Sequence, residues 1–306
     1  MLAQTFHNFT SGDFGAFASV ALHTAMGGYA LAGILAIAAI LVPGRIKPAW
    51  ADRVGLVATG SLLAFFISRF IEGGTAPIQN LFGIISLTAL FIAVVYFLVQ
   101  RSKKMPALAG FAFPAIALLF LATMAVGGSA TKESSEQISN PLLVIHIVTI
   151  ALSFGMFFLA TVAAVMFLIL ENSLKKRKDP DYLRSFPSLE ALRALVNKSV
   201  ICGLPLLTLG LILGFLVLPS LGWASIQHNP KIVTSLTLWL ILVLVTVARK
   251  LGWLHGRRHY YLVLIGFLFL LFTYVGLGVW GHRKAELENT ATEIQKTQCN
   301  DSQYLG

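Results

Sequence analysis

Long apolar runs separated by short polar stretches recur along almost the whole chain. A transmembrane helix needs about 20 mostly apolar residues, and eight segments satisfy this length. The segments lack the strict two-residue alternation of barrel strands, so they predict helices. The sequence therefore predicts an all-α, polytopic integral membrane protein with about eight transmembrane helices. The expected ranges are 17–41, 53–71, 79–99, 107–126, 142–170, 198–218, 232–249 and 260–281.

The composition agrees with this pattern. Of 306 residues, 57% are hydrophobic and 12% are charged, whereas a soluble domain carries about 25% charged residues. A secreted protein with a cleaved signal is excluded because apolar segments recur to residue 281. We expect residues 1–282 to form a single transmembrane domain, and residues 283–306 to form a polar, flexible outer tail.

The net charge of +10 does not require a nucleic-acid partner, because most of the basic residues fall in alternate loops. By the positive-inside rule these loops face the cytoplasm. Both termini then lie outside, and we expect a multi-pass protein of the bacterial inner (cytoplasmic) membrane. The basic residues of these four loops are, in chain order, Arg45, Lys47, Arg53; Arg101, Lys103, Lys104; Lys175, Lys176, Arg177, Lys178, Arg184, Arg193, Lys198; and Arg249, Lys250, Arg257, Arg258.

The longest loop with polar residues on the outer side spans residues 222–239, with the sequence GWASIQHNPKIVTSLTLW. The end of this stretch forms the start of the seventh helix. His146 opens the fifth helix and His282 closes the eighth, so this topology brings both to the same interface. His23 lies about two turns inside the first helix. An ionisable residue within a membrane helix is a functional candidate by default, although a neutral histidine hydrogen-bonded to a neighbouring helix is the slightly favoured interpretation.

Three features on the inner side have structural interpretations. Residues 188–197 carry leucines at helical spacing, which predicts a short amphipathic helix lying on the membrane surface with Ser188 as its N-cap. His255 and His259 have the spacing of two metal ligands on a helix, but their arginine-rich surroundings favour a solvated basic turn. Cys202 is expected to be a small buried residue, on the opposite side from Cys299.

Glycines 203, 210 and 214 lie in the sixth helix. Small residues allow close helix packing in membranes, and they equally make room for a flat cofactor.

Three blocks of sequence carry a family resemblance: NPLLVIHIVTIALSFGMFFLA, NPKIVTSLTLW and KLGWLHGRRHYYLVLIGFLFLLFTYVGL. An earlier block, RFIEGGTAPIQNLFGIIS, is similar more weakly. Together they resemble the haem-handling membrane proteins of cytochrome c biogenesis, the CcsA/CcmC group, with their relatives HemX and YpjD. The similar region covers about residues 60–282.

This resemblance implies that His146 and His282 are the two outer ligands of a haem iron, with the haem b-type and transient. If both bind one iron, their Cα atoms should lie roughly 11–14 Å apart. His23 or His228 is the substitute ligand. The outer loop would edge the cofactor, and the expected cofactor-binding residues are His146, His282, Trp223, His228, Trp239 and Lys231.

The chain departs from the family pattern at several positions. Thr75 and Val247 stand where the family carries membrane-embedded histidines, and the tryptophan-rich loop keeps only Trp223 and Trp239. These departures give weight to an accessory role.

The leading expectation is a haem-binding membrane protein that presents haem at the outer face during cytochrome c assembly. The implied partners are apocytochrome c and a ResB-like or other membrane subunit. If active, the chain belongs to a haem–apocytochrome c ligation system, and alone it is expected to be non-catalytic. The alternatives are a HemX/YpjD-like accessory or regulator of haem metabolism, a subunit of a larger complex, or a small-molecule transporter. The sequence has no Cys-x-x-Cys-His, so the chain is not itself a c-type cytochrome.

Overall fold

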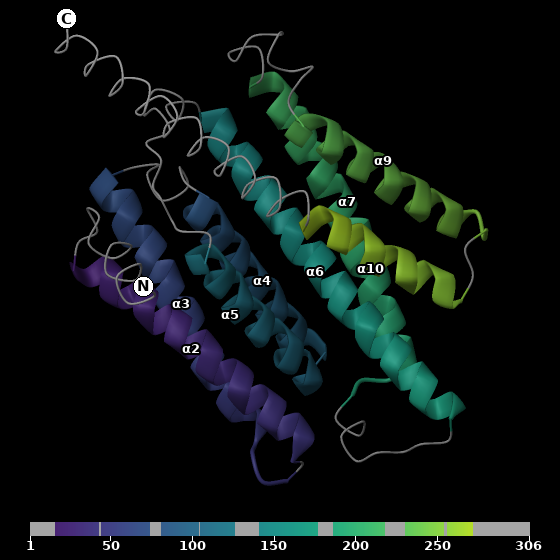
Figure 1. The fold of residues 1–306 in the computed structure, drawn as a ribbon, viewed down its shortest axis with the longest axis horizontal. Helices are drawn as coiled ribbons and strands as arrows, with labels where there is room; N and C mark the ends of the chain where they lie inside the picture. The colour runs from purple at the N-terminus through teal and green to yellow at the C-terminus, as the bar shows by residue number, and fades with distance from the viewer. Residues whose placement is uncertain are drawn as a thin grey trace, which may run out of the picture.

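The computed structural model describes residues 16–42, 44–73, 81–103, 105–125, 141–176, 186–217, 230–253 and 256–271. Within these ranges the chain forms eight α-helices and one short 3₁₀ turn, with no strand, which confirms the predicted all-α class (Figure 1). The elements are α2 (Ala16–Leu41), α3 (Pro48–Gly73), α4 (Leu81–Lys103), η2 (Pro106–Leu108), α5 (Ala109–Ala125), α6 (Pro141–Lys175), α7 (Leu189–Val217), α9 (Pro230–Lys250) and α10 (Arg257–Leu271).

Six of these helices are long and apolar enough to cross a membrane, namely α2, α3, α4, α6, α7 and α9. A shorter apolar helical stretch covers Pro106–Leu121. Many large apolar side chains point outward, for example Ile34, Leu56 and Ile212, which are more than half exposed. Such a surface suits lipid and not water, so the chain is a multi-pass membrane protein.

Successive helices run up and down the bundle (Figure 1). The connections that follow α2, α4, α6 and α9 therefore lie towards one end, which we call the basic end because Arg45, Lys47, Lys175, Lys176 and Lys250 lie there. This arrangement is the one that the alternating basic loops predicted.

The first four helices pack against one another through small residues and aromatic rings. A Cβ added to Gly55 of α3 would lie 2.3 Å from Phe113 of α5, so the ring rests directly on the α3 backbone. Tyr96 of α4 stacks edge-to-face on the same ring at 4.9 Å between centroids. The Tyr96 hydroxyl donates to Asp52 of α3, and Gln100 donates to the other carboxylate oxygen at 3.1 Å. These contacts join α3, α4 and α5.

The last four helices form a second group, in which α6 contacts α7 and α10, and α9 contacts α7 and α10. Aromatic pairs hold α10 on α6: Phe158 meets Phe267 at 5.8 Å and Phe167 stacks on Tyr260 at 4.1 Å. The two groups meet where α4 packs on α6. Gly155 permits this contact, because a Cβ there would lie 3.3 Å from the Phe91 backbone of α4.

The segment expected to lie on the membrane surface has a different place. Residues 189–197 are helical, but they form the first turns of α7, which continues to Val217. Leu192 and Val196 are fully buried and Leu195 is 8% exposed, so the leucine face packs on protein and the expected separate surface helix is wrong. The predicted cap is confirmed, because the Ala191 amide donates to the Ser188 hydroxyl at 3.2 Å.

Candidate functional site

His146 lies near the start of α6 and is half-buried against α7. Its Nδ1 is 2.6 Å from the carbonyl oxygen of Gly210. A carbonyl oxygen only accepts hydrogen bonds, so Nδ1 carries the proton and Nε2 presents a lone pair. A metal-binding histidine usually has this arrangement, with one ring nitrogen donating to a backbone carbonyl and the other left for the metal.

The glycines of α7 make this contact possible. A Cβ on Gly214 would lie 2.8 Å from Cε1 of His146, and a Cβ on Gly210 would lie 2.5 Å from Ile150. Gly203 is less tight, since the nearest atom, Cβ of Met156, is 3.2 Å away. Side chains of α6 thus occupy the glycine face of α7. Of the two alternatives for these glycines, the described residues show close helix packing.

A second α6 side chain repeats the bond made by His146. The Ser153 hydroxyl donates to the Gly203 carbonyl at 3.0 Å. His146 and Ser153 are seven residues apart, as are Gly210 and Gly203, so the two bonds lie two turns apart along an antiparallel helix pair. Together they fix the register of α6 on α7, and therefore the height of His146 in the bundle.

Trp239 lies in α9, well inside the helix, and is partly buried. Its indole N–H donates to the Thr208 hydroxyl of α7 at 2.9 Å, and that hydroxyl donates to the Leu204 carbonyl at 2.9 Å. Thr208 and Gly210 are about 200° apart around α7. Trp239 and His146 therefore meet α7 on nearly opposite sides, and the structure does not bring them together.

Of the other predicted site residues, two lie in the described part of the chain and three lie outside it. His23 lies in α2, where its Nδ1 contacts the Ser19 carbonyl at 2.7 Å, and α4 and α5 lie between α2 and α6 (Figure 1). His23 is therefore not brought to His146. Lys231 lies in the first turn of α9. The remaining candidates, Trp223, His228 and His282, lie outside the described residues, and so does Thr75.

His259 is not solvated, contrary to expectation. It is 3% exposed, and its Nε2 accepts a hydrogen bond from the guanidinium of Arg249, because the first turn of α10 packs back against α9. Glu171 of α6 forms ion pairs with Lys175 at 2.8 Å and with Arg257 of α10 at 3.3 Å. No cluster of three or more His, Cys, Asp or Glu side chains able to hold a metal occurs in the part of the chain that the structure describes.

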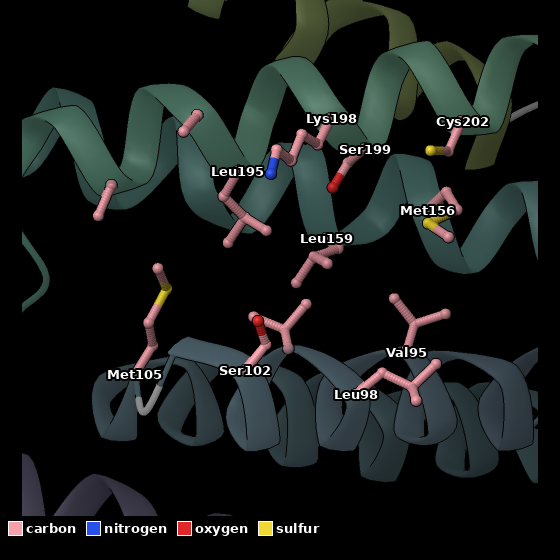
Figure 2. Close-up of a pocket in the computed structure, with 13 residues that line it drawn as sticks. Val95, Leu98, Ser102, Met105, Met156, Leu159, Leu195, Lys198, Ser199 and Cys202 are labelled. Carbon is pink, nitrogen blue, oxygen red and sulfur yellow. The ribbon is translucent and has the colours of Figure 1, made fainter.

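Two features of the described residues had no signal in the sequence. The acceptor that orients His146 is a backbone carbonyl, which any residue type supplies. The second is Cys202, which is exposed on α7 instead of buried. It lines a cavity at the surface of α4, α6 and α7 together with Lys198 and Ser199 (Figure 2).

Several known proteins are similar to this chain. Protein HemX of Brevibacillus brevis is 26% identical over 159 residues, which are 50% of this chain and 56% of that protein. Protein HemX of Bacillus subtilis is 30% identical over 148 residues, or 47% of this chain and 52% of that protein. The chain thus spans about half the length of these HemX relatives.

The cytochrome c biogenesis protein CcsA of Guillardia theta is 24% identical over 235 residues, which are 70% of this chain and 77% of that protein. No solved structure matches the chain.

The family model described as cytochrome C assembly protein matches residues 78–283, more than half of the chain. The match begins at the approach to α4 and includes His146, the glycine face of α7 and Trp239, whereas α2 and α3 precede it. This chain therefore belongs to the cytochrome c assembly protein family, in its CcsA/CcmC-type branch with HemX-like relatives.

Proposed function

We propose that this protein binds haem through Nε2 of His146 and acts in cytochrome c biogenesis. The observation that carries the proposal is the hydrogen bond between Nδ1 of His146 and the Gly210 carbonyl, 2.6 Å long. Neutral imidazole is a haem ligand, and the bond selects the tautomer that leaves Nε2 for iron. Among the described residues, no protein group hydrogen-bonds Nε2.

The residues present fit a haem in a second respect. The ring of His146 is held between the Gly210 carbonyl and the Gly214 backbone, so little conformational freedom remains to be lost when iron binds. Haem, when bound, supplies the iron and the vinyl groups used in cytochrome c maturation. His282 is the proposed second ligand, with His228 as its substitute. Lys231 is proposed for the propionates, and Trp223 for the edge of the macrocycle.

Trp239 has a supporting part in this proposal. Its indole N–H donates a hydrogen bond to Thr208, and this bond links α9 to α7. The loop that precedes α9 holds Trp223 and His228 in the sequence, so the position of α9 sets where that loop begins.

The proposed setting is the bacterial cytoplasmic membrane, with the basic end in the cytoplasm and His146 at the opposite, outer end. The proposed partners are haem, apocytochrome c and a ResB-like or other membrane subunit, with the chain non-catalytic on its own.

A second candidate function is a HemX-like accessory of haem metabolism. One observation favours it. Val247 stands at a position where the family carries an embedded histidine, and its side chain is 46% exposed on the surface of the helix bundle. This chain therefore offers neither a ligand nor an enclosed site there. The similarity to two HemX proteins agrees with this alternative.

The test is the absorption spectrum of the purified, reduced protein. Wild type should copurify with haem, and His146→Ala should remove most of it. His23→Ala is the matched control, because it deletes a half-buried membrane histidine on α2, which packs on α3 and α5. An unchanged spectrum in His146→Ala would overturn the proposal.

The two candidate functions are separated by deletion in the native host. Loss of c-type cytochromes supports a direct part in their assembly. Normal c-type cytochromes with altered haem content support the accessory role.

A further inference from the structure

A cavity of about 210 Å³ lies near the basic end, between α4 on one side and α6 and α7 on the other (Figure 2). Its walls are mostly apolar, with the side chains of Val95, Leu98, Met105, Met156, Leu159 and Leu195. No part of the haem proposal uses this cavity, since His146 contacts α7 at Gly210 and Gly214, more than two turns beyond Cys202.

Three polar side chains line this cavity. Figure 2 shows Lys198 and Ser199 of α7 pointing across the gap towards α4, from which Ser102 points back. Ser199 as a whole is only 3% exposed, but its hydroxyl oxygen is open to the cavity, and Lys198 is exposed; within the described ranges neither group has a protein partner. An ammonium and a hydroxyl that both face the cavity offer two hydrogen-bond donors to a ligand with acceptor oxygens.

Along the bundle, the polar groups lie between Met105 and Leu195 on the side of the basic end and the deeper apolar residues on the other side. Ser102 and Lys198 lie nearer the basic end, whereas Val95, Met156 and Cys202 lie deeper. Val95 and Ser102 are two helical turns apart, which is about 10 Å. The cavity is thus elongated along the bundle, near its basic end, and Lys198 is its one charged group.

We propose that this cavity binds one anionic phospholipid, with its phosphate on Lys198 and Ser199 and part of one acyl chain between α4 and α6. Basic pockets between transmembrane helices bind acidic lipid head groups in this manner. The volume is below the roughly 300–1,000 Å³ of pockets for drug-sized ligands, so a slender chain fits better than a macrocycle. The proposal is independent of haem binding at His146.

Native mass spectrometry tests this proposal on the full chain, released from vesicles of phosphatidylglycerol or phosphatidylcholine. Wild type should retain one phosphatidylglycerol and no phosphatidylcholine. Lys198→Gln should weaken retention about fivefold, the effect of one basic residue at a membrane surface. Arg101→Gln is the matched control, because it removes one exposed charge beside Ser102 without lining the cavity, and it should retain the lipid.

Ala194→Phe gives a second test, since it fills the cavity and keeps every charge. It should lose the lipid while its thermal unfolding matches wild type. Equal loss in Lys198→Gln and Arg101→Gln would overturn the proposal in favour of general surface attraction. Retention of the lipid by Ala194→Phe would overturn it as well.

Discussion

The imidazole of His146 lies directly on the backbone of Gly214, one turn beyond the carbonyl that it binds. A Cβ at position 214 would come within 2.8 Å of Cε1 and 3.1 Å of Nδ1. The ring is a planar group near a helix start, and it cannot move away without stretching the 2.6 Å bond to Gly210. The position of the His146 ring therefore requires a glycine at position 214.

Gly214→Ala should displace the His146 ring by several tenths of an ångström and lower the haem content severalfold. Gly203→Ala is the matched control: it lies on the same face of α7, yet its new Cβ would be 3.2 Å from the nearest atom. Both changes gain a similar helix propensity. Reduced absorption spectra of the two variants compare them, and equal haem content would contradict the proposed role of Gly214.

The bond between Trp239 and Thr208 should contribute about 1 kcal/mol to the packing of α9 on α7. A double-mutant cycle with Trp239→Phe and Thr208→Val should give a coupling energy of this size, because each change alone also alters packing. Thr246→Val replaces Thr208→Val in the control cycle, since Thr246 bonds only to Leu242 of its own helix. Unfolding in detergent is the measurement, and a coupling near zero in the test cycle would refute the bond.

Gly55→Ala should destabilise the first helix group by about 1–3 kcal/mol, because the new methyl overlaps the ring of Phe113, which is fully buried. Gly60→Ala is the control on the same helix, where a Cβ meets nothing within 4 Å, and it should cause no loss. Thermal unfolding of the two variants measures the difference. If both variants unfold at the same temperature as wild type, the Phe113 ring can accommodate the added methyl group and the expected overlap is wrong.

Orientation is tested with fusions to alkaline phosphatase, which is active only outside the cytoplasm. A fusion after Gly306 should be active, and one after Asp179, in the basic connection between α6 and α7, should be inactive. The opposite activities would reverse the proposed topology and place His146 at the cytoplasmic face.

The sequence predicted the helices well because hydrocarbon thickness imposes a minimum apolar length. The predicted segment 142–170 is observed as Pro141–Lys175, and 232–249 as Pro230–Lys250. The first turns of α7 were harder to place, because leucines on one face bury equally well against lipid head groups or against neighbouring helices. Only the position of α6 and α4 decides between these outcomes.

Side-chain direction within the helices was the least predictable feature. Cys202 is exposed and His259 is buried, the reverse of expectation for both. In a nearly uniform apolar helix the lipid is as apolar as the protein interior, so hydrophobicity does not indicate which face points inward. The candidate site shows the same limit: His146 was identified from its place at a helix start, but its acceptor is a carbonyl of Gly210.

The contact between Gly33 of α2 and Pro114 of α5, where an added Cβ would lie 3.1 Å from the proline, has a consequence for biosynthesis. The two residues are about 80 positions apart, so α2 and α3 are synthesised well before the helix that covers them. At roughly 5–20 residues per second, the small-residue face of α2 waits on the order of 4–16 s for α5. During that interval lipid or the insertion machinery must occupy the face that α5 later covers.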